Sequence, residues 1–276
     1  MQKTREGSMQ AAARVTGVRR VSINDLIDAL GAGMQDFRRA PRIGLFFGGL
    51  YAVAGWLLIA LLWHFGMPYF AYPLAMGFAL VAPFAAVAFY AVSAKLEKGE
   101  AVTLGGVVTS VREAAKRDLR WMALVTGFGL VIWMDIAAFL FFGFMGFQSF
   151  GPDFVEKLLT TPTGVVFLLL GNVTGALIAL TIFSISAVSF PMLYDRDVDF
   201  VTAMTTSVRV VVANPVAMIA WCCVIAVLIG VSILSVFLGL FLVMPVIGHA
   251  TWHLYRRAVE PAAGGALTGE AAAQEA

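Results

Sequence analysis

Charged side chains are scarce in this 276-residue chain: Asp, Glu, Lys and Arg make up 13% of it, whereas hydrophobic residues make up 60%. The few charges are also unevenly spread, so that several stretches of roughly 20 residues, the length of one helical membrane crossing, contain none. A soluble globular protein does not have this composition. We therefore expect an all-α, polytopic membrane protein with one membrane domain and no soluble domain.

The sequence also lacks the short motifs that mark common catalytic sites. It has no Gly-rich phosphate-binding loop, no HExxH, no nucleophile elbow and no CxxC. Cysteine is limited to Cys222 and Cys223, which are neighbours in an apolar run and would point in different directions from a helix. This favours neither a disulfide nor a metal held by both thiols. We accordingly expect a protein that is not an enzyme and needs no cofactor.

The two ends of the chain differ from the part between them. Residues 1–20 are polar and have neither the apolar core nor the cleavage pattern of a signal peptide, so we expect a flexible tail there. Residues 259–276, rich in Ala, Gly and Glu, are expected to be disordered. The membrane domain then covers 21–258.

The basic residues predict the orientation of this domain. Residues 1–42 hold eight Lys and Arg, and 93–121 hold six, whereas 66–70 hold none and 145–163 only Lys157. By the positive-inside rule, we expect the N-terminus and the 93–121 loop in the cytoplasm. With the six spans described below, the C-terminus is also expected in the cytoplasm and the 145–163 loop outside. The same basic segments also carry acidic residues, which does not favour binding to nucleic acid.

Six apolar stretches predict six transmembrane helices. The last two come from one run after Pro215 that carries no charge until Arg256. As a single helix this run would measure about 54 Å, nearly twice the ~30 Å hydrocarbon core, so we expect two short crossings hinged near 230–235. The predicted spans are about 43–65, 71–92, 121–143, 164–188, 215–233 and 236–254.

Three amphipathic segments, at about 22–37, 103–117 and 199–214, each precede a pair of spans, and the third is the clearest. Asp199 is placed to cap its first turn, and Pro215 to end it. One face is expected to be apolar, with Phe200, Met204, Val208 and Val211, and the other polar, with Thr202, Thr205, Thr206 and Arg209.

Sequence similarity between these segments predicts an internal repeat. Thr109–Arg112 has the same four residues as Thr206–Arg209, and Asp25 precedes Pro41 by the interval that separates Asp199 from Pro215. We therefore expect three repeats, each an amphipathic surface helix followed by a transmembrane hairpin.

Asp135 is the ionisable side chain nearest the middle of a predicted span. A carboxylate there costs roughly 2.5–3.5 kcal/mol on insertion scales, so it should face other helices and have a partner. Asn172 of the next span lies at a similar depth: it is about 24 Å from the inner end of its span, and Asp135 is about 21 Å from the inner end of its own. Two hypotheses stay open: a hydrogen bond that fixes the helix register, or a proton or cation site. Thr181 and Ser184 extend a polar strip that would suit a water path.

His249 and His253 lie four residues apart, so both project from one face of the last predicted span near its cytoplasmic end. Such a pair can chelate a transition metal if a third ligand, such as a carboxylate from 195–199, is near. The alternative, which we favour, is that both are interfacial anchors and that there is no metal site. His64 is expected at the opposite membrane face, so a haem held by histidines from two helices is not supported.

Asp195, Asp197 and Asp199 resemble the opening of a calcium-binding loop. However, Phe200 stands where that loop requires glycine. Helix capping and pairing with Arg196 explain the acidic cluster better, and we expect it at the cytoplasmic face.

Two parts of the chain carry a family resemblance: Ser189–Pro191 with Asp195–Val198 and Asn214–Pro215, and the stretch Gly248–His253. Together with the six-span layout they resemble, over about 20–258, an uncharacterised bacterial family of predicted integral membrane proteins of unknown function. Its members are sometimes labelled automatically as cytochrome c oxidase subunit-like. The resemblance implies a location in the cytoplasmic membrane and supplies no activity.

These observations predict a non-enzymatic scaffold or assembly protein whose partners are membrane lipid and other membrane proteins. The alternative is a small transporter or channel that moves protons or solutes past Asp135 and the polar residues of the fourth span. The oligomeric state does not follow from the sequence.

Overall fold

The computed structural model describes residues 17–67, 70–75, 77, 86–146 and 153–261. No strand is found among these residues, apart from one isolated bridge between Val18 and Val259. The expectation of an all-α protein is therefore confirmed. The helices are α2 (Ile23–Arg39), α3 (Pro41–His64), α5 (Val87–Glu97), α6 (Leu104–Lys116), α7 (Leu119–Met145), α8 (Phe154–Thr160), α9 (Pro162–Ser186), α10 (Ser189–Asp195), α11 (Phe200–Ala213), α12 (Pro215–Leu234) and α13 (Leu240–Ala258).

Four helical segments in the described part are long and apolar enough to cross a membrane: α3, α7, α9 together with α10, and α12. This confirms a multi-pass helical membrane protein, and α3, α7, α9 and α12 match the first, third, fourth and fifth predicted spans. The second predicted span, 71–92, includes residues outside the described part. The sixth, 236–254, corresponds to α13, which is not among the four.

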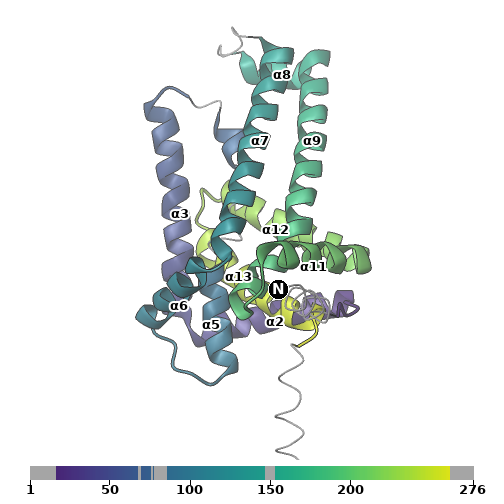
Figure 1. Ribbon diagram of the computed structural model, residues 1–276. Coiled ribbons are helices and arrows are strands. Elements are labelled where there is room, and N and C mark those ends of the chain that lie inside the picture. Colours follow the sequence, from purple (N-terminus) through teal and green to yellow (C-terminus); the bar gives the residue numbers. More distant parts are fainter. Residues whose placement is uncertain (1–16, 68–69, 76, 78–85, 147–152, 262–276) are drawn as a thin grey trace, which may run out of the picture.

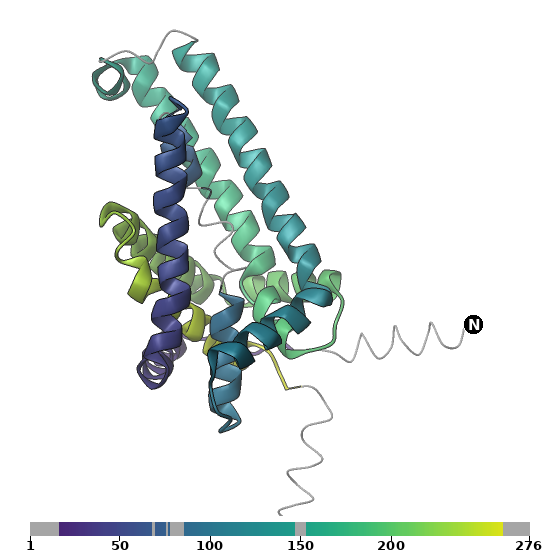
Figure 2. The same cartoon turned by 90° about the vertical axis from the view of Figure 1, so that its left-hand side faces the viewer.

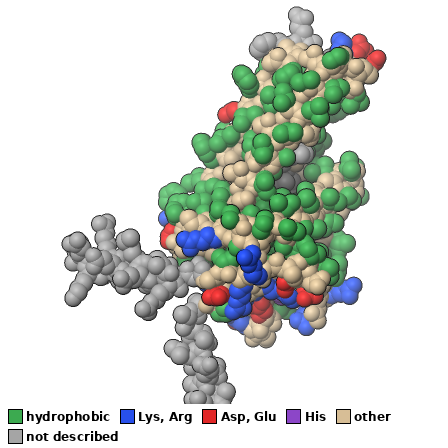
Figure 3. Space-filling model, turned by 90° about the vertical axis from the view of Figure 1, so that its right-hand side faces the viewer, with side chains coloured by type: hydrophobic (Ala, Val, Ile, Leu, Met, Phe, Trp, Pro, Cys, Tyr) green, Lys and Arg blue, Asp and Glu red, His purple; other side chains and the backbone are tan. Residues whose placement is uncertain are grey.

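Two groups of helices, a base and an arm, can be distinguished in the molecule, and α3 and α12 belong to neither (Figure 1). The helices α7 and α9 rise side by side and α3 rises apart from them, whereas α2, α6 and α11 lie near their lower ends, as the view in Figure 2 also shows. We call α2, α5, α6, α10, α11 and α13 the base, and α7, α8 and α9 the arm. In Figure 3, Lys and Arg gather over the base, while hydrophobic side chains cover most of the arm. This is the distribution expected when amphipathic helices lie at a membrane surface.

The helix α13 forms the centre of the base, where it packs along α2, α3 and α5. Most of its side chains are buried, among them Trp252 and Tyr255. Two glycines allow its neighbours to approach closely. A Cβ atom on Gly33 of α2 would lie 2.6 Å from the backbone nitrogen of Ala250, and one on Gly48 of α3 would lie 2.9 Å from a backbone oxygen of α13. The sixth predicted span is therefore largely enclosed by protein.

The turn between α12 and α13, at 235–239, lies beside the middle of α3. Trp56 Nε1 donates a hydrogen bond to the carbonyl oxygen of Val236 (2.7 Å). Trp56 lies about 22 Å from the start of α3, and the whole helix, from Pro41 to His64, is about 35 Å long. The α12–α13 hairpin thus turns back before it reaches the far end of α3, and its turn comes just after the interval 230–235 predicted for it.

Two surface helices meet their following helices in the same way. Ala40, between α2 and α3, has φ −129° and ψ 52°, and Asn214, between α11 and α12, has φ −133° and ψ 54°. In both cases proline, Pro41 or Pro215, is the first residue of the next helix. Proline has no N–H to lose at this position and its fixed φ suits a helix start, which explains why it marks both junctions.

The helix caps explain where the surface helices begin. The carboxylate of Asp199 accepts a hydrogen bond from the backbone N–H of Thr202 (2.8 Å), as predicted for the start of α11. The start of α2 is different, because Asp25 is the third helical residue and not the cap. Ser22 caps this helix, and the Asp25 carboxylate accepts from the backbone N–H of Ser22 (2.8 Å), which completes a capping box.

The apolar stripe predicted for α11 is not its buried face. Val208 of that stripe is exposed, whereas Thr206, predicted on the polar side, is only 1% exposed and donates to the carbonyl oxygen of Thr202. Small side chains allow α11 to approach its neighbours closely, and the hydroxyl of Ser207 accepts from the backbone N–H of Val188 (3.3 Å). The buried residues of α11 are Ala203, Thr206, Ser207 and Val210.

The two ends of the described chain lie next to each other on the base. The backbone N–H of Arg19 donates to the carbonyl oxygen of Ala258 (2.9 Å), next to the bridge between Val18 and Val259. The side chain of Asn214 donates to the carbonyl oxygen of Arg19 (3.1 Å). Both ends are therefore held at the junction of α11 and α12.

Candidate functional site

Four polar side chains meet inside the base: Asp36 of α2, Ser93 of α5, and His249 and His253 of α13. Asp36 Oδ2 accepts a hydrogen bond from Ser93 Oγ (2.7 Å) and lies 2.7 Å from His253 Nε2. Ser93 Oγ also lies 2.8 Å from His249 Nδ1. Asp36 is 4% exposed, and Ser93 and His249 are fully buried. We call these four residues the polar cluster.

The bonds of the polar cluster define where its protons lie. Because Ser93 donates its hydroxyl proton to Asp36, its oxygen accepts the Nδ1–H of His249. Burial acts to raise the pKa of Asp36, but the hydrogen bonds from His253 and Ser93, with the attraction of both histidines, outweigh it and hold this pKa below its ordinary value. Asp36 is therefore a charged group whose partners come from two other helices.

A second set of polar contacts surrounds the last turns of α13. Tyr255 donates to Asp195 Oδ2 (2.7 Å), and Trp252 Nε1 donates to Glu97 Oε1 (3.0 Å). Arg256 lies between the same two carboxylates, 3.2 Å from Glu97 and 3.4 Å from Asp195. These contacts join α13 to α5 and α10, so that the end of the last helix fastens two elements of the base.

The predicted acidic cluster is spread over three different contacts. Asp195 lies 3.6 Å from Arg196 in addition to its bonds with α13. Asp197 has an exposed side chain 3.9 Å from Arg117, and Asp199 caps α11. The expected pairing with Arg196 is thus found at Asp195.

The histidines share one face of α13, as their spacing indicates, but the carboxylate that they approach is Asp36. The third ligand proposed from 195–199 is engaged elsewhere, by Tyr255 and Arg256 in the case of Asp195. Over the described ranges, no group of three or more His, Cys, Asp or Glu side chains is placed to hold a metal ion. The polar cluster instead connects α2, α5 and α13.

Asp135 and Asn172 lie on adjacent helices of the arm, but they do not bond to each other. Asp135 is exposed on α7. The side-chain oxygen of Asn172 accepts from the hydroxyl of Tyr72 (2.8 Å), and its nitrogen donates to the carbonyl oxygen of Leu168 (2.8 Å). The predicted register-fixing hydrogen bond is therefore replaced by a contact between α9 and the segment that carries Tyr72.

The remaining polar candidates of α9 bond within their own helix. Thr181 Oγ1 donates to the carbonyl oxygen of Leu177 (2.8 Å), and Ser184 Oγ donates to that of Leu180 (2.7 Å). Hydroxyls satisfied in this way need no polar neighbour on another helix.

Sequence reasoning missed Asp36 and Ser93. Asp36 lies on the buried face of α2, in line with the small residues Ala29 and Gly33. The available signal was the spacing of Asp36 from Ala29 and Gly33, which puts an acidic residue on the same helix face as two small residues. Ser93 gave no such signal, because serine is common in membrane helices as a small packing residue.

Comparison with known proteins gives a match to a family model. Residues 71–195 match the model of a family described as "Predicted integral membrane protein (DUF2189)". No curated protein and no solved structure matches this chain. The matched segment includes Ser93 of the polar cluster, together with Asp135 and Asn172 of the arm. The family that this match identifies is the one that the sequence resembles, a family of predicted integral membrane proteins whose function is unknown.

Proposed function

We propose that this protein is a non-enzymatic scaffold of the cytoplasmic membrane, in which the base holds the arm upright and the arm docks a helix of a partner membrane protein. The observation that carries this proposal is the position of Asp135. It is exposed on α7, among apolar side chains that are themselves exposed.

The surroundings of Asp135 form one continuous face of α7. Phe128, Val131 and Phe139 are 67%, 53% and 78% exposed, and they fall at helical spacing on either side of the aspartate. A carboxylate on a lipid-facing surface costs roughly 2.5–3.5 kcal/mol at the centre of a helix, unless a partner supplies a hydrogen bond or a positive charge. A partner helix with a hydroxyl, amide or basic side chain at this depth would meet that need.

Photocross-linking in intact cells tests this docking. A benzophenone amino acid at position 139, next to Asp135, should form a protein adduct in the wild-type background. Asp135→Leu should reduce this adduct about tenfold, the equivalent of ~1.4 kcal/mol of lost affinity, whereas Asp135→Asn should retain it because an amide can still make hydrogen bonds.

The matched control is the same cross-linker at Leu57 of α3, which is 59% exposed and lies on a different helix. Its adducts should not respond to Asp135→Leu. An adduct of twice the chain's mass would identify the partner as a second copy. The proposal fails if position 139 gives no protein adduct, or if its adduct survives Asp135→Leu. If Asp135→Asn abolishes a proton or solute flux while the adduct remains, the transporter alternative is favoured.

We further propose that the chain crosses the membrane six times, in three repeats, with its termini in the cytoplasm. The similar backbone angles at Ala40 and Asn214 support equivalent junctions in the first and third repeat. The pairing of Arg19 with Ala258 supports termini on one side of the membrane. The Lys and Arg side chains gathered over the base support the cytoplasm as that side. In this arrangement α12 and α13 form the shortest hairpin.

A further inference from the structure

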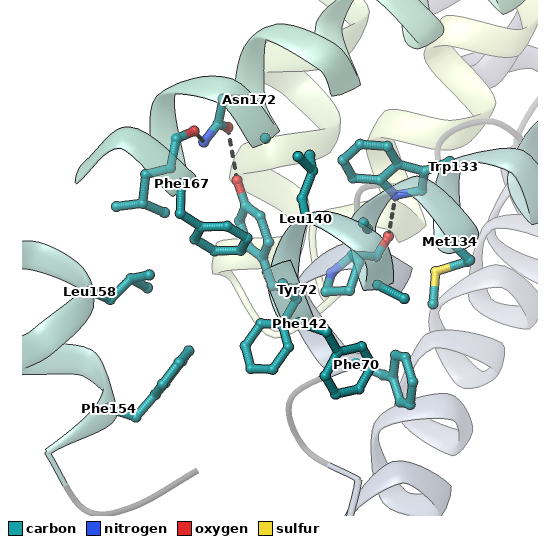
Figure 4. Close-up of a pocket in the computed structure, with 16 residues that line it drawn as sticks. Phe70, Tyr72, Trp133, Met134, Leu140, Phe142, Phe154, Leu158, Phe167 and Asn172 are labelled. Atoms are coloured by element: carbon teal, nitrogen blue, oxygen red, sulfur yellow. Dashed lines mark hydrogen bonds between the residues drawn. The ribbon is translucent and has the colours of Figure 1, made fainter. Parts of the chain in front are cut away.

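The arm encloses a cavity of about 280 Å³ between α7, α8, α9 and the segment that carries Tyr72. Figure 4 shows that aromatic side chains surround it, among them Phe70, Phe142, Phe154 and Phe167. None of its lining residues is charged. A charged ligand group would find no partner inside it, so the cavity suits an uncharged, apolar ligand.

The few polar groups at the cavity bond to each other or to the backbone. Tyr72 donates to Asn172 (2.8 Å), and Trp133 Nε1 donates to the carbonyl oxygen of Pro73 (2.8 Å), as the dashed lines in Figure 4 show. These two bonds hold the Tyr72 segment against α9 and α7. The polar groups that make these two bonds are therefore already paired within the wall, which again favours an apolar occupant.

The cavity adjoins a surface that faces lipid. Gly171 and Asn172 line it, and the residues on either side of this pair in the sequence, Leu170 and Val173, are 45% and 58% exposed. On the far side, Leu158 of α8 lines the cavity, while the next residue, Leu159, is 62% exposed. Because apolar surface continues outward from both walls, a ligand would arrive from the bilayer and not from water.

From these features we propose that the cavity binds one acyl chain of a membrane phospholipid, in the half of the bilayer far from the base. The volume of about 280 Å³ supports a single chain, since it lies just below the roughly 300–1,000 Å³ found for ligand cavities. The headgroup stays outside, because no charged side chain lines the cavity to receive it. This cavity is separate from the face of α7 proposed above to dock a partner helix, since Asp135 does not line the cavity.

A glycine of the wall provides a direct test. A Cβ atom on Gly171 would meet no atom within 4 Å, so Gly171→Phe would place its ring in open space at the cavity wall. Gly143 of α7 is the matched control, because a Cβ atom there also meets nothing within 4 Å and this residue does not line the cavity.

The experiment uses the full chain in nanodiscs that contain a phospholipid with a diazirine in its acyl chain. After illumination, we expect mass spectrometry to find adducts on the cavity walls, at 133–142 and 167–172. Gly171→Phe should lower these adducts about tenfold, the equivalent of ~1.4 kcal/mol, relative to adducts on the exposed face of α3. Gly143→Phe should leave the ratio unchanged.

Native mass spectrometry of the purified wild type provides a measurement that does not depend on a variant. We expect one phospholipid to remain bound to the wild type and to Gly143→Phe after detergent exchange, and to be lost from Gly171→Phe. If Gly171→Phe does not fold, the smaller Gly171→Val should show an intermediate loss. Wild-type protein that retains no phospholipid, or wall adducts no more frequent than those on α3, would overturn the proposal, as would retention of a different apolar molecule.

Discussion

Asp36 is the residue on which three helices of the base converge. Its carboxylate accepts from Ser93 and pairs with His253, and it is almost fully buried. A buried charge is stable only when its partners replace the water that it loses. Removal of this charge should therefore loosen the attachment of α13 to α2 and α5 together.

We predict that Asp36→Asn lowers the free energy of unfolding by about 1.5–3 kcal/mol, the range for a hydrogen bond to a charged group. Thermal unfolding in mild detergent measures this loss. Asp28→Asn is the control on the same helix, because Asp28 pairs with Arg257 (3.1 Å) at the surface. An exposed pair contributes roughly 0–1 kcal/mol, so the control should melt close to the wild type. Equal melting temperatures for wild type and Asp36→Asn would contradict the role given to Asp36.

The same residue predicts a pH dependence. The pKa of Asp36 is lower in the folded protein than its ordinary value, so the folded state favours the ionised carboxylate. Its contribution is then fully present above the unfolded pKa of about 3.9 and is lost as the pH falls through the folded pKa. We expect the difference in melting temperature between wild type and Asp36→Asn to shrink as the pH falls below about 4. A difference that does not change down to pH 3 would rule out this linkage.

At the scale of elements, α13 depends on backbone contacts that only glycine allows. A Cβ atom on Gly33 would lie 2.6 Å from the backbone nitrogen of Ala250 and 2.7 Å from the backbone oxygen of Val246, both in α13. Backbone atoms cannot move aside as a side chain can. A Cβ atom on Gly31, two residues earlier in α2, would meet nothing within 4 Å. The two glycines therefore separate a packing effect from a helix-propensity effect.

We predict that Gly33→Ala destabilises the protein by about 1–3 kcal/mol through overpacking, whereas Gly31→Ala is neutral or stabilises it by up to about 1 kcal/mol, since alanine is the better helix former. Thermal unfolding of both variants under the same conditions gives the comparison. If Gly33→Ala melts at or above the temperature of Gly31→Ala, the close approach of α2 and α13 does not exist as described.

Local chemistry explains which features of these elements the sequence could predict. Pro41 and Pro215 mark helix starts, and Asp199 a helix cap, because these residues act on the backbone next to them. The buried faces were less predictable, because they depend on neighbours that are distant in the sequence. Thr206 of α11 is buried against helices that offer a close fit to small side chains, and hydrophobicity does not report such a fit.

For the whole molecule, the four apolar helical segments were predictable because bilayer thickness fixes their length and composition. The role of α13 was not, because a helix enclosed by protein and a helix in lipid are both apolar. Of the polar cluster, only the two histidines were predictable from the sequence. The spacing of His249 and His253 showed a shared face, but their partner Asp36 lies more than 200 residues earlier, and only the fold brings it to them.

The arrangement of base and arm predicts a membrane topology that labelling can test. The ends of the described chain pair on the base, and α8 lies at the other end of the arm (Figure 1). In a background with Cys222 and Cys223 replaced by Ala, Lys157→Cys in α8 should react with an impermeant thiol reagent applied to intact spheroplasts, and Glu260→Cys should react only after lysis. Reaction of Glu260→Cys from outside, with Lys157→Cys protected until lysis, would reverse the proposed orientation. Reaction of both from outside would mean that α8 and the chain end share one membrane face. An even number of crossings would then separate α8 from Glu260, whereas the proposed six-span arrangement places three between them, so the count of six would be wrong.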